Sequence, residues 1–171
     1  FAEGKVMFYG QPIFAVIART RNEARLAAAK AKISYEELPA HLDIAAAREN
    51  GMDFVAEPMS LNRGDLDTAM AASPRRIKGS MNLGGQEHFY LESHIALAVP
   101  GEDGDVTLYS STQHPSEIQH AVAHVLDVPS NAITTEIRRM GGAFGGKETQ
   151  GNIFAAIAAL GARKTGQAVK L

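Results

Sequence analysis

Eight consecutive residues near the end of the chain, Gly141-Gly142-Ala143-Phe144-Gly145-Gly146-Lys147-Glu148, combine four glycines with an aromatic ring, a cation and a carboxylate. Glycine lets a backbone come close to a bulky group, and free backbone N–H groups attract anions. A β-branched run at 132–137 precedes this stretch, and a helical pattern of small residues follows it. The order predicts a ligand-binding loop between a strand and a helix.

The spacing Gly141-x-x-x-x-Gly146-Lys147 matches the phosphate-binding loop of nucleoside triphosphatases except at the final position. That position requires Ser or Thr to hold magnesium, but here it is Glu148, whose carboxylate would repel a polyphosphate. The dinucleotide-binding pattern G-x-G-x-x-G fails too, because the glycines lack its offsets. We therefore expect a different large group at this loop.

Gln113 is a second candidate for site chemistry. It follows a predicted strand and precedes a helix that begins at Pro115. A side chain at such a junction can point into a cleft. The alternative, a polar residue that caps the helix, is equally compatible with the local pattern.

Several other polar residues have simpler explanations. His120 and His124 have the i, i+4 spacing that can chelate a metal, but they lie opposite the apolar helix face and favour a solvated surface. Glu87-His88 and Glu92-x-His94 could also ligate a metal, although alternation along a strand explains them equally well. The hydroxyl cluster 110–112 lacks the G-x-S-x-G pattern, which argues against a serine hydrolase.

Composition narrows the function classes further. The 171 residues carry a net charge of −2 with scattered basic residues, so no nucleic-acid surface is indicated. No apolar run is long enough to span a bilayer. The chain has no cysteine, which excludes disulfides, thiolate metal sites, iron–sulfur clusters and cysteine nucleophiles within it. Its first residue is Phe1, and we expect a piece of a longer polypeptide.

The first part of the chain predicts a small β-β-α-β unit. Strands are expected at 6–9, 12–18 and 33–36. A capping box at Thr20-Arg21-Asn22-Glu23 predicts a helix to about Ala31. A short helix is expected from Asp43 to about Gly51, before a stretch with little periodicity.

The second part predicts strands and helices that position the candidate residues. Strands are expected at 75–83, 88–99, 106–111 and 132–138, and helices at 115–127 and 149–164. The apolar face of the first of these helices is formed by Ile118, Val122, Val125 and Leu126. Gly166 is placed to end the last helix.

Three motifs together resemble the molybdenum-binding part of the xanthine oxidase family of molybdenum hydroxylases, which includes the xanthine dehydrogenases. They are Gly84-Gly85-Gln86-Glu87-His88-Phe89-Tyr90-Leu91-Glu92, Ser111-Thr112-Gln113, and Arg139-Met140-Gly141 through Glu148. The motifs occur in the family's order and at similar spacing. The opening segment, from Tyr9-Gly10-Gln11-Pro12 to Leu38-Pro39, resembles the end of the family's hammerhead domain.

This resemblance implies an α+β fold. Residues 1–50 are expected to be the C-terminal part of an aldehyde oxidase/xanthine dehydrogenase hammerhead domain. Residues 51–74 are the expected linker, and 75–171 the N-terminal part of a molybdenum-cofactor-binding domain.

The resemblance also implies roles for individual residues. Gln113 would hydrogen-bond an oxo ligand of the molybdenum, while Phe144 and Gly145 would lie against the molybdenum-pterin cofactor. Glu148 corresponds to the family's purine-binding glutamate, where aldehyde-oxidising relatives tend to carry an apolar residue. The family's general base lies outside this chain, so no catalytic residue can be assigned.

The implied reaction is oxidation of xanthine or hypoxanthine towards urate, a step of purine catabolism, with water as the oxygen source. Iron–sulfur clusters and FAD are expected on a partner subunit or domain, and the rest of the molybdenum subunit is a further expected partner. We expect a cytoplasmic protein without nucleic-acid or membrane partners, and an isolated chain that is inactive. The alternatives are a hydroxylase of another heteroaromatic or an aldehyde, and a non-catalytic fragment that holds no cofactor.

Overall fold

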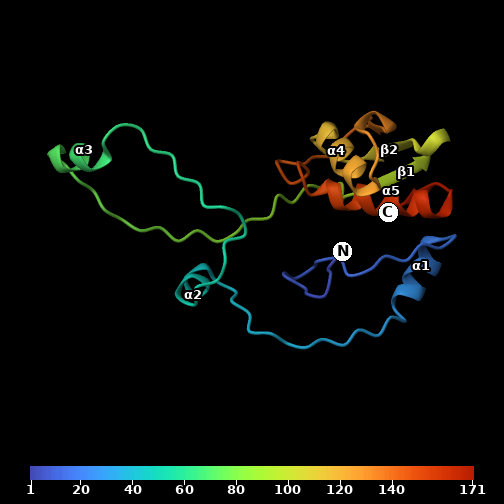
Figure 1. The fold of residues 1–171 in the computed structure, drawn as a ribbon, viewed down its shortest axis with the longest axis horizontal. Coiled ribbons are helices and arrows are strands. Elements are labelled where there is room, and N and C mark those ends of the chain that lie inside the picture. The colour runs from blue at the N-terminus through green and yellow to red at the C-terminus, as the bar shows by residue number, and fades with distance from the viewer. The chain divides into compact units, whose positions relative to one another are not determined.

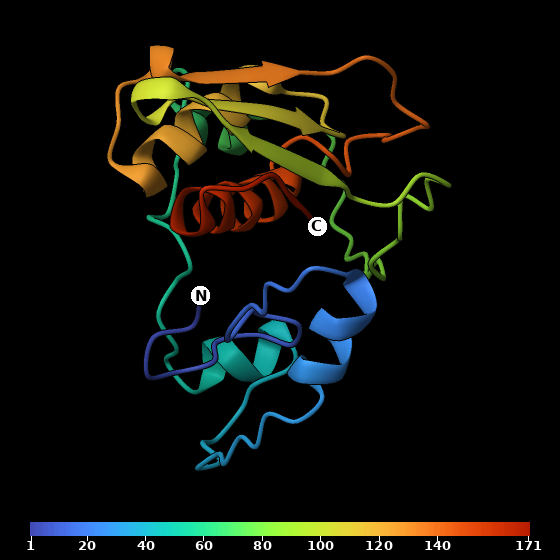
Figure 2. The same ribbon diagram turned by 90° about the vertical axis from the view of Figure 1, so that its right-hand side faces the viewer.

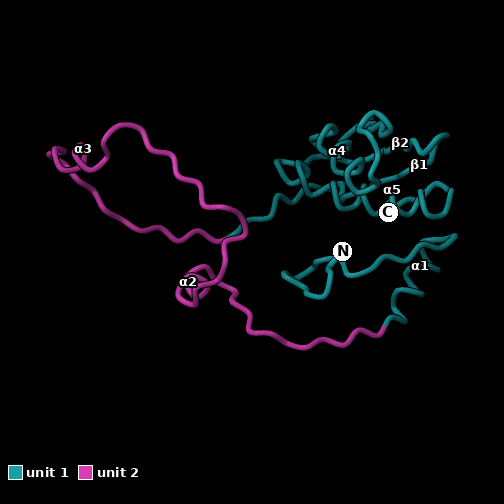
Figure 3. The backbone as a smooth tube through the Cα atoms, viewed as in Figure 1, with its two compact units in different colours: residues 1–31, 85–171 teal, residues 32–84 magenta.

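The computed structural model describes residues 1–171 as two units, which are coloured separately in Figure 3. Unit 1 consists of residues 1–31 and 85–171, and unit 2 of residues 32–84. Unit 1 contains a four-stranded sheet, two long helices and all the candidate site residues. None of the helices has both the length and the apolar character needed to cross a bilayer.

The sheet has the strand order β3-β2-β1-β4. Its strands are β1 (Ala96–Pro100), β2 (Val106–Ser110), β3 (Ile133–Glu136) and β4 (Val169–Lys170). β1 pairs antiparallel with β2 and β4, while β2 pairs parallel with β3. Short 3-10 turns, η1 (Glu102–Gly104) and η2 (Ser130–Ala132), lead into β2 and β3. The expected strand at 106–111 and the strand before the glycine loop are therefore confirmed as β2 and β3.

Two helices, α4 (Pro115–Leu126) and α5 (Gly151–Thr165), cover one face of this sheet (Figures 1 and 2). α4 begins with a proline, whose missing N–H costs nothing at that position. It ends at Asp127, which adopts a left-handed conformation. Gly166 ends α5 with a φ of 66°, as the sequence predicts.

The core lies between the sheet and these helices. Alternate residues of the antiparallel pair β1–β2 point inward, as the period of two requires, and they pack with α4 and α5. The inward residues of the two strands are Ala96, Ala98, Val106 and Leu108, and those of the helices include Ile118, Val122, Ala155, Ala158, Ala159 and Ala162. Because α5 buries only alanines and glycines, its backbone can lie close to the sheet.

One residue of the predicted helix face is misplaced. Val125 is 47% exposed, and Ala123 is buried instead. The buried arc of α4 is centred between Ile118 and Ala123, so Val125 lies at its margin.

Each of the three short helices begins at a residue whose side chain caps its N-terminus. In α1 (Arg21–Ala28), Thr20 and Glu23 form the predicted capping box. Asp43 caps α2 (Ile44–Glu49), which confirms the expected short helix. A further helix, α3 (Leu66–Ala72), was not predicted, although Asp65 caps it in the same way through the N–H of Thr68.

The strands predicted at 6–9, 12–18, 33–36 and 75–83 are wrong, because none of these segments pairs with a neighbouring strand. Extended backbone becomes a sheet only where its N–H and C=O groups find a partner strand. The predicted strand 88–99 forms only from Ala96 onward. Phe89 has a φ of 51°, which interrupts extended geometry, and the residues after it contact the glycine loop instead.

Candidate functional site

The glycine loop follows β3 and closes on itself in a tight turn. The backbone N–H of Gly146 donates to the carbonyl of Ala143 at 2.8 Å. Phe144 and Gly145 between them have φ values of 54° and 91°, so both occupy the left-handed region. Glycine adopts this region freely, whereas a phenylalanine there is held by its surroundings. Phe144 is 76% exposed at the tip of the turn.

The loop differs from a phosphate cradle in two ways. α5 begins only at Gly151, so the loop does not lead directly into a helix N-terminus. Lys147 has a fully buried side chain, whereas the lysine of a phosphate-binding loop must reach its ligand. The structure therefore supports the prediction from Glu148 that this is no triphosphate site.

Gln113 lies directly against this turn. Its side-chain Oε1 accepts hydrogen bonds from the backbone N–H groups of Gly145, at 3.0 Å, and Lys147, at 3.4 Å. The carbonyl of Lys147 is hydrogen-bonded as well, since it accepts from the backbone N–H of Gln113 and the hydroxyl of Thr112. The oxygen of the Gln113 amide is thus occupied, while its NH2 group has no partner in the chain. The amide does not cap α4.

The structure thus brings three of the sequence-predicted site residues to one turn. Phe144 and Gly145 form the tip of this turn, and Gln113 is hydrogen-bonded to it. Glu148 follows immediately, and its exposed carboxylate makes no hydrogen bond or ion pair. An open amide donor, an exposed ring and a free carboxylate are suited to bind a ligand that has both polar and planar parts.

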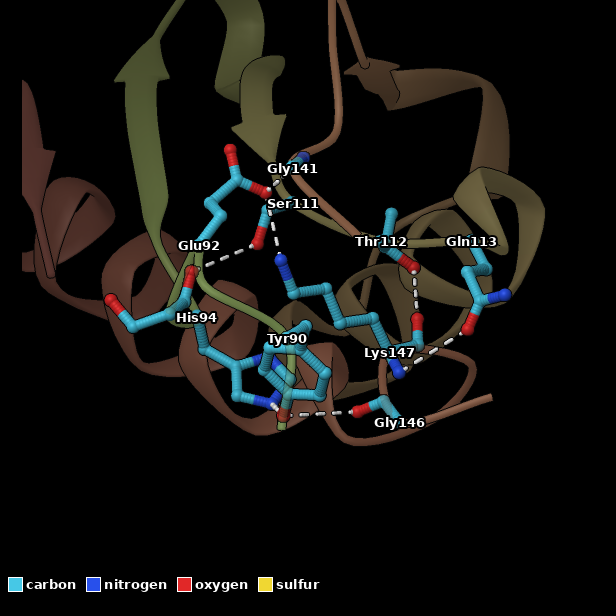
Figure 4. A network of polar contacts seen from close by, with 10 residues as sticks. Tyr90, Glu92, His94, Ser111, Thr112, Gln113, Gly141, Gly146 and Lys147 are labelled. Carbon is cyan, nitrogen blue, oxygen red and sulfur yellow. Dashed lines mark hydrogen bonds and ion pairs between the residues drawn. The ribbon is translucent and has the colours of Figure 1, made fainter. Parts of the chain in front are cut away.

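The segment 88–94 supports the loop from the other side (Figure 4). Lys147 Nζ lies 2.7 Å from Oε2 of Glu92 and 4.7 Å from the centre of the Tyr90 ring. Tyr90 also contacts Gly146 closely, because a Cβ atom at Gly146 would lie only 2.5 Å from its Cε1. Sequence reasoning missed the pairing of Glu92 with Lys147, since no local pattern relates residues 55 positions apart.

This network shifts two pKa values. The Lys147 ammonium and the N–H of Gly141 bond to the Glu92 carboxylate and lower its pKa below the usual value. Burial, aided by the charge of Lys147, lowers the pKa of His94, which favours its neutral form. The Nε2 atom of His94 lies 2.8 Å from the Tyr90 hydroxyl, and its ring stacks on Phe154.

The metal sites considered in the sequence do not form. His120 and His124 are exposed on α4, and the chain has no group of three or more His, Cys, Asp or Glu residues placed to hold a metal. Glu92 and His94 instead face Lys147 and Phe154. Any metal at this loop would therefore need ligands from another source, such as a bound cofactor.

Comparison with known proteins assigns the family. Residues 47–171 match the model of the molybdopterin cofactor-binding domain, and residues 1–39 match the a/b hammerhead domain of aldehyde oxidase and xanthine dehydrogenase. The chain belongs to the xanthine oxidase family. The sequence-based identification and the α+β fold, with a hammerhead end before the cofactor-binding domain, are confirmed.

Two relatives whose names give different substrates have nearly the same sequence identity to this chain. The chain is 44% identical to a xanthine dehydrogenase/oxidase of Gallus gallus over 99% of its length, and 43% identical to aldehyde oxidase 1 of Oryctolagus cuniculus over the same share. It covers only 12% and 13% of those proteins. The aldehyde oxidoreductase of Desulfovibrio gigas has the same fold, with a TM-score of 0.71 at 25% identity over 90% of this chain and 18% of that one.

The residues of the loop fit a molybdenum-pterin cofactor. A large polar cofactor needs hydrogen-bond donors and a backbone that it can approach closely. The free NH2 group of Gln113 supplies such a donor, and the exposed turn at Phe144–Gly145 supplies such a backbone. The absence of cysteine presents no obstacle, because the cofactor brings its own sulfur ligands to the metal.

Proposed function

We propose that this chain forms one wall of the active site of a molybdenum hydroxylase that oxidises xanthine or hypoxanthine towards urate, with water as the oxygen source. The observation that carries the proposal is that the carboxylate of Glu148 has no partner within the chain. Its carboxylate is exposed beside the loop and unpaired, while the neighbouring Lys147 is occupied by Glu92. Glu148 is therefore free to bind a ligand with N–H groups, as purines have.

Within this proposal each residue has a limited task. The NH2 group of Gln113 donates a hydrogen bond to the cofactor, and Phe144 with Gly145 provides the surface against which the cofactor and substrate lie. Glu148 accepts a hydrogen bond from the purine and stabilises charge that develops on its ring. The cofactor, when bound, accepts the electrons that leave the substrate. The general base belongs to a part of the enzyme beyond these residues.

In the full enzyme this chain would adjoin further domains and a partner subunit or domain. Residues 1–50 would complete a hammerhead domain, 51–74 would serve as a linker, and 75–171 would begin the molybdenum-binding domain. The rest of the molybdenum subunit would enclose the cofactor, and iron–sulfur and FAD centres on a partner subunit or domain would carry the electrons away. We propose a cytoplasmic location and a role in purine catabolism.

The substitution Glu148→Ala in the full-length enzyme tests the substrate. A charge-assisted hydrogen bond contributes about 1.5–3 kcal/mol, so kcat/KM for xanthine should fall about 10- to 100-fold further than kcat/KM for a small aldehyde. Glu148→Gln should be intermediate, because it keeps an acceptor without the charge. The control Glu102→Ala removes an exposed carboxylate from the β1–β2 turn and should change neither substrate.

Equal losses on both substrates would contradict the purine assignment. They would favour the second candidate, a hydroxylase of an aldehyde or another heteroaromatic, to which the 43% identity with aldehyde oxidase 1 also lends support. Molybdenum analysis of the purified full-length protein addresses the third candidate. A protein without molybdenum under conditions that load a known molybdenum hydroxylase would indicate a non-catalytic, cofactor-free role.

A further inference from the structure

We propose that Glu92 and Lys147 are a positioning pair, a clasp that joins the two ends of the glycine loop and holds its binding groups in place. Neither residue touches the proposed ligands, so their effect acts through the loop. The consequences for substrate rest on the proposed function, whereas the conformation of the loop can be measured without it.

The clasp is formed by a single carboxylate oxygen. Oε2 of Glu92 accepts a hydrogen bond from the backbone N–H of Gly141 at 3.1 Å and from Lys147 Nζ at 2.7 Å. These donors lie at the first residue of the loop and at the residue before Glu148. One side chain from another segment therefore fixes both ends, as Figure 4 shows.

Close contacts leave the loop little freedom to move on this clasp. A Cβ atom at Gly141 would lie 2.7 Å from Cβ of Glu92, a distance that side chains essentially never tolerate. The two backbones are also joined directly, since the N–H of Glu92 donates to the carbonyl of Gly141 at 3.4 Å. The segment 88–94 thus packs against both ends of the loop, with Glu92 at Gly141 and Tyr90 at Gly146.

Lys147 transmits the clasp to the ligand-binding groups. Its side chain is fixed by Glu92, and its backbone is fixed by Gln113 and Thr112. Loss of the side-chain anchor would loosen the backbone N–H that bonds Gln113, and with it the position of Glu148 on the next residue. The geometry therefore couples a partly buried ion pair to the orientation of two proposed ligand contacts.

A positioning role accounts for this pair better than stability does. A buried ion pair repays its desolvation poorly, and apolar residues of similar size often replace one without loss of stability. Ion pairs of this kind are better suited to specify one arrangement among several. Glu92 is also partly solvent-exposed, with 35% of its side chain accessible, which weakens the pair as a source of stability.

The test uses the full-length protein with Lys147→Met, Glu92→Gln and the double variant. Hydrogen exchange of a peptide spanning 139–148 is compared with that of a peptide from β1 and β2. We expect exchange of the loop peptide to accelerate by about tenfold or more in each single variant, with the sheet peptide unchanged. Because the two residues act as a unit, the double variant should show much less than the product of the single effects.

Enzyme kinetics and a matched control complete the design. KM for the purine should rise about tenfold in Lys147→Met, with partial rescue in Lys147→Arg, while the melting temperature changes little. The control Arg19→Met breaks an exposed i, i+4 pair with Glu23 and should affect neither readout. If purine activity is absent in the wild-type enzyme as well as in every variant but loop exchange still accelerates, the clasp stands and the purine assignment fails.

Two results would overturn the proposal. In the first, loop exchange and KM remain unchanged in both single variants. In the second, loop and sheet peptides accelerate together, which would indicate a general loss of stability rather than positioning. Lys147→Met guards against a variant that simply fails to fold, because it removes the buried charge, keeps most of the side-chain volume and leaves unpaired only the partly exposed carboxylate of Glu92.

Discussion

The side-chain oxygen of Gln113 accepts the backbone N–H of Gly145 at 3.0 Å, although 32 residues separate them along the chain. This hydrogen bond joins the strand–helix junction after β2 to the tip of the glycine loop. It also decides how the amide is used, because the oxygen faces the protein and the NH2 group faces outward. The candidate site therefore presents an oriented amide donor beside the free carboxylate of Glu148.

Gln113→Glu tests the orientation of this amide. Glutamate keeps the oxygen that accepts from Gly145 and Lys147 but replaces the outward NH2 donor with a second acceptor. We expect the melting temperature to remain within a few degrees of wild type. Molybdenum content or turnover of the loaded enzyme should fall on the order of 10- to 100-fold, the loss of one charge-assisted hydrogen bond.

The matched variant for Gln113 is Gln113→Ala, which removes the acceptor as well. It should lower function and also stability, by about 0.5–1.5 kcal/mol, because the hydrogen bonds to the exposed N–H of Gly145 and the partly buried N–H of Lys147 are lost. Wild-type molybdenum content and turnover in Gln113→Glu would show that the outward donor has no role.

Phe144→Gly should separate stability from function at the tip of the loop. A residue with a Cβ atom is destabilised by about 1–2 kcal/mol in the left-handed region, so glycine relieves this strain. The larger backbone entropy that glycine loses on folding cancels part of that stabilisation. The ring is mostly exposed, so the free energy of unfolding should change by less than about 1 kcal/mol. Cofactor retention or purine turnover should nevertheless decrease.

A buried residue provides the contrast for Phe144. Leu108→Ala removes a fully buried core side chain of β2 and should destabilise the protein by about 2–5 kcal/mol. Chemical denaturation of both variants measures the difference. A destabilisation by Phe144→Gly as large as that by Leu108→Ala would mean that the ring packs against the protein.

Gly141→Ala should destabilise the loop through a steric clash. The new methyl group would meet Cβ of Glu92 at 2.7 Å, and because this neighbour is not the end of a flexible chain, the backbone must shift. We expect a loss of about 1–3 kcal/mol, measured by thermal or chemical denaturation. Gly85→Ala is the control, because its Cβ would enter open space. Equal tolerance of both substitutions would contradict the close packing of loop and segment.

The environment of His94 predicts a pH dependence of stability. Its pKa in the folded state is lowered from the usual 6.5, first by burial and then by the charge of Lys147. The unfolded state therefore binds a proton at higher pH than the folded state does. This contribution to stability is complete above about pH 6.5 and is lost as the pH falls through that value towards the folded pKa.

The variant His94→Gln should consequently flatten the decline in melting temperature between about pH 7.5 and about pH 5.5. His124→Gln is the matched control, because it removes an imidazole from the exposed side of α4, away from this network. An unchanged slope in His94→Gln would show that the ring titrates alike in both states. Lys147→Met should raise the pKa of His94 only in part, since burial is the larger cause.

Prediction from the sequence succeeded where the structural cause is local. The capping box at Thr20 and Glu23 and the helix end at Gly166 depend on neighbours within a few residues, and both form as expected. The same is true in part of the turn at Phe144, because the adjacent Gly142 and Gly145 supply two of its positive φ values. Prediction failed for the strands at 6–9 and 12–18, because an extended segment needs a partner that its own residues cannot specify.

The site divides in the same way. The chain by itself determined which chemical groups are available: an amide at Gln113, a glycine-rich turn around Phe144, a carboxylate at Glu148, and no cysteine. Only the tertiary structure decided how they are used, since it buries Lys147 against Glu92 and turns the NH2 group of Gln113 outward. The physical reason is that hydrogen bonds and ion pairs act over a few ångströms in space, and chain folding alone brings residues 32 or 55 positions apart within that range.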